Sequence, residues 1–238
     1  MMSPVARPAS TVVLLRPSNS RFEVFLVRRH DNVAFMGGAH VFPGGRVDPG
    51  DRPADDDIGR VVRESVDRVR GITVSDLAAH FHGGARELAE EAGVTLAPDA
   101  LVPFARWVTP EIEIRRFDAL FFVARAPADQ EAVHDGRETT EGRWLDPAAA
   151  IAQCRAGAIA LPPPTWTTLR TLERFARSDD VLAWARTRVI VAVQPRMTDA
   201  DGGKLLVLPG DRDYPALEHF DTPAETRFVF DDRRWTPA

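Results

Sequence analysis

The chain has 238 residues, a formal net charge of −5, 44% hydrophobic and 27% charged residues, values that are ordinary for one large globular domain. The negative charge argues against nucleic-acid partners, which need a basic surface to track phosphates, and no apolar run is long enough to predict a membrane span. The single cysteine, Cys154, excludes an intrachain disulfide and fits a reducing, cytoplasmic compartment.

The first predicted elements are two strands. Thr11–Leu15 and Glu23–Arg28 are rich in β-branched and aliphatic residues, and the turn-forming stretch Pro17–Ser20 between them predicts a hairpin. A glycine-dense loop around a short strand follows at residues 35–45, where glycines permit a ligand to approach the backbone closely. Apolar residues at helical spacings then predict a helix over Asp56–Val69.

An acidic helix comes next, and Ser75 is predicted to cap its start. Within residues 86–94 the carboxylates of Glu87, Glu90 and Glu91 have relative positions 0, +3 and +4, which places them on one face of a helix. Like charges at these spacings repel, so the face gains stability from a bound cation, and hard carboxylate oxygens suit Mg²⁺ or Mn²⁺.

Beyond this helix, strands and helices follow one another in an order that predicts an α/β/α sandwich around a mixed sheet. The apolar run within Phe117–Arg125 is typical of a central strand buried on both faces. Asp146 and Pro147 open a helix that ends near Arg155, and the prolines at 162–164 form a rigid connector. The other predicted elements are a strand at Leu101–Thr109, helices at Thr165–Arg177 and Asp179–Thr187, and strands at Val189–Val193, Lys204–Leu208 and Arg227–Phe230.

Residues 86–94 resemble the second half of the Nudix box, G-x5-E-x7-R-E-U-x-E-E-x-G-U, in which U is a bulky aliphatic residue. Phe42-Pro43-Gly44-Gly45 resembles the segment that commonly opens this box, and Asp51 stands where the family usually has its first Glu. The Arg52–Ala85 segment is 27 residues longer than the family spacing. The resemblance therefore implies a Nudix-type α/β/α fold with an insertion inside the box, at about residues 52–80.

A split box of this kind resembles the peroxisomal coenzyme A diphosphatases and their bacterial relatives. The segments that add to this resemblance are Phe35–Val41, Val47–Pro49, Arg116–Asp118, Asp135–Glu138 with Trp144, and Leu161–Pro163. The coenzyme A signature is met only in part, because Ala34 occupies the position of its arginine. We expect a single Nudix domain over residues 1–238, with a C-terminal α/β extension at about 162–238.

The resemblance implies hydrolysis of a nucleoside diphosphate linked to another group, in which water attacks a phosphorus and divalent cations neutralise the phosphates. Glu90 and Glu91 are the first choices as metal ligands, and Glu87 is either a third ligand or the group that orients the water. The Gly44 carbonyl is a backbone metal ligand by the same resemblance.

Arg86 is expected to hold the two halves of the box together by pairing with the first acid of the box. Here that acid is Asp51, which is one methylene shorter, so the pair depends on reach. Glu138 and Glu141 are both candidates for a general base outside the box, and the alternative for each is a solvated acidic loop.

Substrate contacts are expected from side chains near the glycine-rich loop and the strands. Planar guanidinium groups are suited to clamp phosphates, although surface arginines without such a role are the common alternative. A structural role is likewise the alternative for the histidine in the loop. The substrate-binding candidates are Arg28, Arg29, His40, Gly45, Arg115 and Arg116.

The sequence therefore predicts a Mg²⁺- or Mn²⁺-dependent diphosphatase that acts on coenzyme A or acyl-coenzyme A and forms adenosine 3′,5′-bisphosphate and a 4′-phosphopantetheine. ADP-ribose, NADH and dinucleoside polyphosphates are alternative substrates, because hydrolases of these compounds use the same box. A non-catalytic Nudix-like binding module is a third alternative, which the intact acidic triad disfavours. A homodimer through the strands after Val189 is left open.

Overall fold

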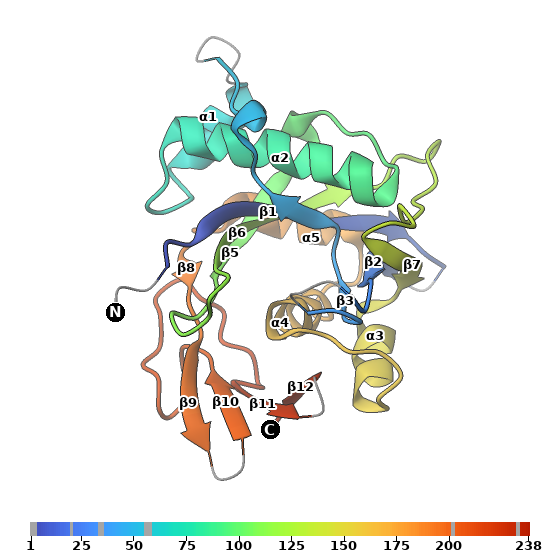
Figure 1. Cartoon of the computed structure of the whole chain (residues 1–238). Coiled ribbons are helices and arrows are strands. Elements are labelled where there is room, and N and C mark those ends of the chain that lie inside the picture. Colours follow the sequence, from blue (N-terminus) through green and yellow to red (C-terminus); the bar gives the residue numbers. More distant parts are fainter. Residues whose placement is uncertain (1–3, 20, 33–35, 55–58, 201–202, 232–233) are drawn as a thin grey trace.

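The computed structural model describes residues 4–19, 21–32, 36–54, 59–200, 203–231 and 234–238. Within these residues, eight strands form a mixed sheet in the order β3-β2-β1-β6-β5-β8, with β4 paired to β1 and β7 paired to β2 (Figure 1). The strands are β1 (Arg7–Pro17), β2 (Phe22–Arg29), β3 (His40–Val41), β4 (Gly44–Arg46), β5 (Val102–Val108), β6 (Phe117–Arg125), β7 (Thr139–Leu145) and β8 (Ala192–Val193).

The centre of this sheet is formed by β1 and β6. β1 and β2 form the predicted antiparallel hairpin, with Leu15 opposite Val24, and β1 also pairs in parallel with β6 along its length. In β6, Phe121 and Val123 contribute to one core and Leu120 and Phe122 to the other. The strand is therefore buried on both faces, as its continuous apolar run predicted.

One face of the sheet is covered by two helices, α1 (Arg60–Val66) and α2 (Val74–Ala92), which lie above the sheet in Figure 1. Leu77, Phe81 and Leu88 of α2 are fully buried against this face. Gly93, at φ +66°, ends α2 in the left-handed conformation that glycine adopts without a steric penalty.

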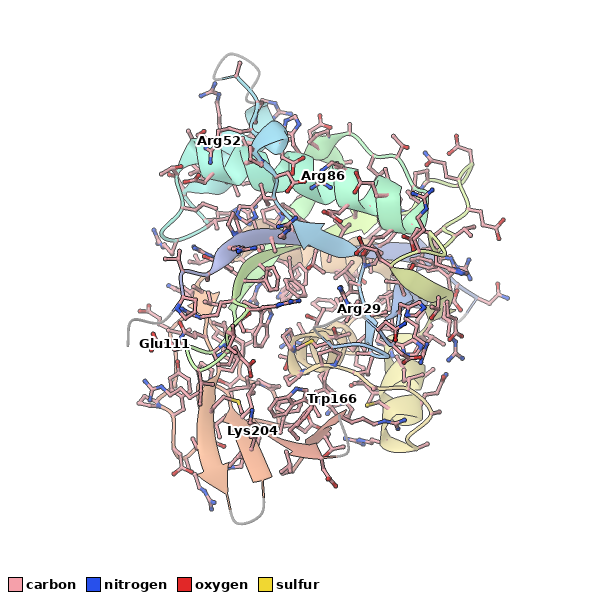
Figure 2. The ribbon with its side chains drawn as sticks, viewed as in Figure 1. Arg29, Arg52, Arg86, Glu111, Trp166 and Lys204 are labelled. Atoms are coloured by element: carbon pink, nitrogen blue, oxygen red, sulfur yellow. The ribbon has the colours of Figure 1, made fainter. Side chains whose placement is uncertain are left out.

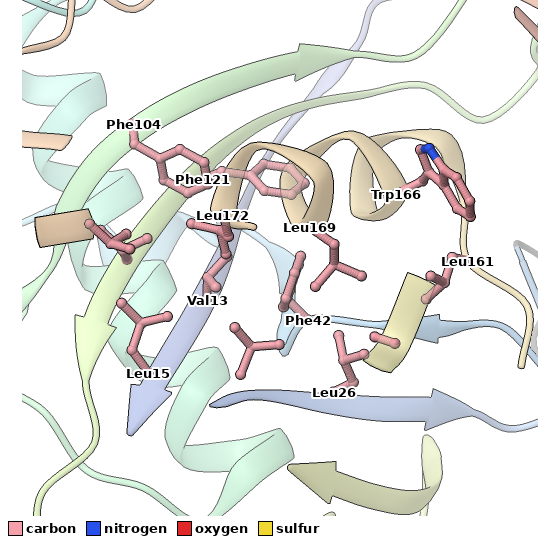
Figure 3. Packing of buried hydrophobic residues seen from close by; sticks show 14 of the residues in the cluster. Val13, Leu15, Leu26, Phe42, Phe104, Phe121, Leu161, Trp166, Leu169 and Leu172 are labelled. Atoms are coloured by element: carbon pink, nitrogen blue, oxygen red, sulfur yellow. The ribbon is translucent and has the colours of Figure 1, made fainter. Parts of the chain in front are cut away.

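The other face is covered by α3 (Pro147–Arg155), α4 (Pro163–Leu172) and α5 (Ser178–Thr187). Figure 3 shows Leu169 and Leu172 of α4 packed near Val13 of β1 and near Phe42 in the turn between β3 and β4. Helices on both sides of a mixed sheet make the α/β/α sandwich that the sequence predicted.

A second, four-stranded antiparallel sheet follows in the C-terminal extension, in the order β12-β11-β10-β9. It comprises β9 (Arg196–Ala200), β10 (Gly203–Val207), β11 (Arg227–Asp231) and β12 (Arg234–Pro237). Leu206 and Phe228 from this sheet are buried in the same core as α4. The extension is therefore packed onto the core of the sandwich.

Several element boundaries differ from those predicted. The predicted helix over 56–69 is observed as α1 only from Arg60, and its first residues, like Ala34 and Phe35, lie outside the described residues. The start of α2 is capped by Thr73, whose hydroxyl accepts a hydrogen bond from the Asp76 N–H, so the prediction of Ser75 as the cap is wrong. Pro163 and Pro164 belong to the first turn of α4, where a missing N–H costs nothing.

No helix among the described residues is long and apolar enough to cross a membrane.

Candidate active site

The candidate site lies where the C-terminal half of α2 faces the turn between β3 and β4. Glu87, Glu90 and Glu91 project from α2, and β4 holds Gly44 and Gly45 against β1. The Gly44 N–H donates a hydrogen bond of 2.8 Å to Glu91 Oε2. A Cβ at Gly45 would come within 2.5 Å of Glu87 Oε2, so only glycine allows this carboxylate to lie against the backbone.

Arg86 joins the two halves of the split box. Its Nε and Nη2 donate hydrogen bonds of 2.9 Å to the two carboxylate oxygens of Asp51, and Nη2 also donates to the Arg46 carbonyl at 2.8 Å. Burial opposes ionisation of Asp51, but the hydrogen bonds from Arg86 and the Asp48 N–H outweigh it and lower the pKa of Asp51. The shorter acid therefore reaches Arg86 in a bidentate pair.

Asp51 reaches Arg86 because its surroundings bring it close. It ends the 3-10 turn η1 (Pro49–Asp51), in which the Asp48 N–H donates to Asp51 Oδ2 at 2.8 Å. On the opposite side, a Cβ at Gly83 would lie 3.0 Å from the same oxygen, closer than ordinary contacts. The absence of a side chain at Gly83 thus makes room for the Asp51 carboxylate next to α2.

The remaining Arg86 donor, Nη1, lies 2.9 Å from carboxylate oxygens of both Glu87 and Glu90. Burial raises the pKa of Glu87, although Arg86 opposes this effect. Burial also raises the pKa of Glu91 to about 7, against the hydrogen bond from Gly44 and the positive charge of Arg29. The helix thus holds carboxylates that are costly to ionise together.

Among the described residues, no three His, Cys, Asp or Glu side chains converge tightly enough to form a ready-made metal site. The donor set nevertheless fits a hard divalent cation. Glu87, Glu91 and Glu138 lie near enough that the negative charge of Glu138 raises the pKa of the other two, and all three offer carboxylate oxygens. A cation among them would relieve the repulsion that the unmetallated carboxylates experience.

The two candidate bases occupy different places. Glu138 is exposed and acts electrostatically on Glu87 and Glu91. Glu141 instead pairs across the strands with Arg28, which pairs in turn with His40, so these three side chains share one face of the sheet. Since Leu26 also points to that face and packs in the α4 core, Glu141 lies on the side of the sheet away from α2.

His40 is a buried histidine on this second face. Its Nε2 lies 3.6 Å from Glu141 Oε2, and neither ring nitrogen has a hydrogen-bond partner in the described part of the chain. Burial lowers the pKa of His40, although Glu141 opposes this effect. The structure therefore places His40 with Glu141 and not with the acidic helix.

The predicted arginines also separate into groups. Arg29 is close enough to Glu91 to lower its pKa, and its buried Nε has no hydrogen-bond partner among the described residues (Figure 2). Arg28 is instead bonded to Asp31 and Thr140. Arg116 donates to the carbonyl oxygens of Thr109 and Pro4, and Arg115 is exposed in the connection between β5 and β6. Of the four predicted arginines, Arg29 is thus the one placed beside the acidic carboxylates.

Comparison with known proteins bears on the family and the fold of the chain. No family model matches the chain. It is 29% identical to an acyl-coenzyme A diphosphatase of Xenopus laevis over 123 residues, which are 49% of this chain and 32% of that protein. It is 24% identical to an acyl-coenzyme A diphosphatase of Homo sapiens, with 88% of this chain and 77% of that protein covered. Among solved structures, a Nudix hydrolase from Alicyclobacillus acidocaldarius shares 24% identity with a TM-score of 0.61, covering 75% of this chain and 96% of that one.

The chain resembles the Nudix hydrolases. The predicted resemblance and the predicted fold are both confirmed by these matches, since the curated relatives and the solved structure are Nudix hydrolases or diphosphatases. The match to the Xenopus protein spans about a third of that protein's length. The sequence analysis listed Asp135 as part of a segment of the family resemblance but did not select it as a site residue. Its carboxylate accepts a hydrogen bond from the Glu138 N–H and organises this loop. The sequence signal that marks it is an Asp-Gly pair followed by polar residues, which is typical of a turn.

Proposed function

We propose that this chain is a metal-dependent diphosphatase that cleaves the anhydride of a nucleoside diphosphate linked to a second group. The observation that carries the proposal is the acidic face of α2 packed against Gly44 and Gly45, with Glu138 and Arg29 beside it. This arrangement offers oxygen ligands for a cation and an unpaired guanidinium in one place.

Mg²⁺ or Mn²⁺ would be held by the carboxylates of Glu87, Glu90 and Glu91 and by the Gly44 carbonyl. When bound, the cation neutralises charge on the diphosphate oxygens. Arg86 contacts one carboxylate oxygen of Glu87 and one of Glu90, so the second oxygen of each would serve the cation while the pair of Arg86 with the buried Asp51 remains. In this proposal Arg86 stabilises the site and does not touch the substrate.

The protein groups then divide the remaining work. Arg29 would bind a phosphate oxygen through its guanidinium, a bidentate donor whose Nε has no hydrogen-bond partner among the described residues. Glu138 would accept a proton from the water whose oxygen attacks the phosphorus, while the bond from phosphorus to the bridging oxygen breaks. We assign the base to Glu138 and not to Glu141, because Glu141 lies on the other face of the sheet. Gly45 would admit the substrate next to Glu87.

We propose coenzyme A or acyl-coenzyme A as the substrate. Two relatives that are named acyl-coenzyme A diphosphatases support this choice. The split box of this chain supports it as well. The position of the arginine in the coenzyme A signature holds Ala34, so the adenosine phosphate must find its positive partner elsewhere. ADP-ribose, NADH and dinucleoside polyphosphates are the substrates to compare.

The test is hydrolysis of coenzyme A, acetyl-coenzyme A, ADP-ribose, NADH and diadenosine polyphosphates by the pure protein with Mg²⁺ or Mn²⁺. We expect turnover of the coenzyme A compounds, and a loss of at least about 100-fold in kcat for Glu91→Gln, since even indirect ligand partners contribute 10–100-fold to metal sites. Glu131→Gln, an exposed glutamate outside the acidic face, is the matched control and should retain full activity.

The outcomes separate the alternatives. Turnover of ADP-ribose alone would refute the coenzyme A assignment and keep the reaction class. No turnover of any compound, with Glu91→Gln and the unsubstituted protein indistinguishable in Mn²⁺ binding, would support a non-catalytic binding module.

A further inference from the structure

The loop that precedes β7 is organised by a single carboxylate. Asp135 Oδ1 accepts hydrogen bonds from the Thr139 N–H at 2.9 Å, the Thr139 hydroxyl at 2.6 Å and the Arg137 N–H at 3.2 Å. Its Oδ2 accepts from the Glu138 N–H at 3.0 Å. Gly136, at φ +70°, permits the turn between Asp135 and these donors. Three consecutive backbone amides are thus directed at one side chain.

This carboxylate stays ionised at any ordinary pH. Partial burial opposes its ionisation, but the hydrogen bonds from Thr139 and from the loop amides outweigh burial and lower the pKa of Asp135 to about 2. Hydrogen bonds to an ionised acceptor are stronger than those between neutral groups. The loop conformation is therefore held by charge-assisted bonds that do not weaken between neutral and mildly acidic pH.

The residue held at the centre of this loop is Glu138. Its N–H is bound to Asp135, and its carbonyl accepts a hydrogen bond of 2.9 Å from the His30 N–H. Both sides of its backbone are thus fixed, while the side chain is exposed and its negative charge acts on Glu87 and Glu91. A carboxylate on an unrestrained loop would spend only part of its time in this position.

The same loop is joined to the strand that presents the free arginine. Thr139, which is fully buried, pairs with Arg29 at the point where the register between β2 and β7 shifts. The N–H and the hydroxyl of Thr139 both donate to Asp135, so they connect the loop to the residue at which the pairing of β7 with β2 begins. Asp135 is positioned to fix Glu138 relative to both Arg29 and α2.

We propose that Asp135 is a positioning residue, which holds the backbone of Glu138 so that the Glu138 carboxylate faces the acidic side of α2. The inference rests on the proposed function, in which Glu138 accepts the proton of the attacking water. Asp135 touches neither water nor substrate in this role. Its effect on the rate passes through Glu138.

The test is a double-mutant cycle of Asp135→Ala and Glu138→Gln, measured as kcat and KM with the best substrate from the panel. Asp135→Ala should lower kcat about 10-fold with little change in KM, because misplacement of a base costs part of the roughly 100-fold or greater benefit of general base catalysis. In the Glu138→Gln background, Asp135→Ala should lower kcat no further. Asp135→Asn keeps one acceptor oxygen for Thr139 but presents an amide NH2 to the Glu138 N–H, so it should recover only part of the activity lost in Asp135→Ala.

A matched control is Asp146→Ala, which removes a comparable cap, the acceptor of the Ala148 and Ala149 N–H groups at the start of α3. It should leave kcat unchanged in both backgrounds. Hydrogen exchange gives a readout that does not depend on activity: the amides of residues 137–139 should exchange faster in Asp135→Ala and retain protection in Asp146→Ala.

Two outcomes would overturn the inference. The first is an undiminished kcat in Asp135→Ala together with faster exchange of the loop amides. The second is a decrease in kcat for Asp135→Ala that is as large in the Glu138→Gln background as in the unsubstituted protein. That result would indicate that Asp135 has a general structural role. If Glu138→Gln is fully active while Glu91→Gln is inactive, the roles of Glu138 and Asp135 both fall and the diphosphatase proposal stands. If Glu91→Gln is also fully active, the assignment of the metal site to the acidic face of α2 fails, and absence of turnover in the unsubstituted protein refutes the diphosphatase proposal itself.

Discussion

Arg86 is the residue on which the geometry of the candidate site depends. One guanidinium contacts Asp51 from the first half of the box and Glu87 and Glu90 from the second half. The Asp51 side chain is only 6% exposed, so the bidentate pair is shielded from water on one side, whereas Glu90 is 58% exposed. We therefore expect most of the stabilisation by Arg86 to come from its pair with Asp51.

Replacing Asp51 with Ala should lower the free energy of unfolding by about 2 kcal/mol, because it removes two charge-assisted hydrogen bonds and leaves part of Arg86 unpaired. Asp48→Ala is the matched control. Its carboxylate lies 3.9 Å from Arg86 and is 54% exposed, so its loss should cost less than about 0.5 kcal/mol. Urea unfolding monitored by circular dichroism measures both. Equal stabilities of the two variants would contradict the central role of the Asp51 pair.

At this scale the sequence predicts best where spacing alone decides the geometry. Helical periodicity was sufficient to place Glu87, Glu90 and Glu91 on one face of α2, because the period of a helix is fixed by its backbone. It was insufficient to separate Glu138 from Glu141. The face of the sheet on which each glutamate lies depends on the pairing of β7 with β2 and on the register shift between Arg28 and Arg29. A spacing of three residues in a predicted loop does not reveal this pairing.

At the scale of elements, α2 shows how the insertion is accommodated. The helix runs without interruption from Val74 to Ala92, so the insertion supplies its first half and the box supplies its second half. Leu77 from the inserted part is buried in the same core as Phe81 and Leu88, which follow it in the helix. The insertion therefore anchors the acidic helix to the sheet over a longer contact.

The start of α2 gives a prediction about this element. Thr73→Ala should lower the free energy of unfolding by about 1 kcal/mol, since it removes the acceptor of the Asp76 N–H in the first turn. Ser75→Ala is the control. The Ser75 hydroxyl bonds only to the exposed guanidinium of Arg52, so its loss should change stability by less than about 0.5 kcal/mol. Thermal or urea unfolding compares the two, and a larger loss for Ser75→Ala would restore Ser75 as the cap.

The elements missed from the sequence share a physical reason. β7 reads Thr-Thr-Glu-Gly-Arg-Trp-Leu and is only partly buried along most of its length, so it lacks the apolar alternation that marks a strand. Its conformation comes from pairing with β2, a contact distant in sequence. β12 is a four-residue edge strand that ends in Pro237, and proline is confined to such edges. The long apolar strands β1 and β6, in contrast, were found because burial on two faces leaves a clear apolar run.

At the scale of the whole molecule, the sheet separates two cores. The core under α2 supports the acidic helix, and the core under α4 includes Leu206 and Phe228 from the second sheet. The sequence predicted strands in the extension but not their attachment, because packing between sheets depends on side chains far apart in the chain. The C-terminal extension thus shares one hydrophobic core with α4 and the sheet.

His80 is a buried residue of α2 that contacts strand β1 of the sheet. The hydroxyl of Ser10 from β1 donates to the His80 carbonyl at 2.8 Å and lies 3.1 Å from the His80 Nδ1. Burial lowers the pKa of His80 to about 4, and nearby Arg106 adds to the effect while Asp118 and Asp76 oppose it. The folded protein therefore keeps this imidazole neutral where an unfolded chain would protonate it.

The contribution of His80 to stability should consequently decrease as the pH falls from about 6.5 to about 4, while the buried Glu91, whose pKa is raised to about 7, contributes in the opposite direction in the same range. In this window the unfolded chain binds a proton at His80 and the folded chain does not, so protonation favours unfolding; above pH 6.5 the contribution is fully present. The shift in the pKa of His80 corresponds to about 3 kcal/mol at most.

Urea unfolding of the unsubstituted protein and of His80→Gln from pH 7 to pH 4 measures this contribution of His80. Between pH 6.5 and pH 4, His80→Gln should lose less stability than the unsubstituted protein. The slope that remains combines the buried His40, whose pKa is lowered like that of His80, with Glu87 and Glu91, whose raised pKa values act in the opposite direction. His134→Gln, at a partly exposed histidine, should retain the full slope, and equal slopes for all three proteins would show that His80 does not couple folding to pH.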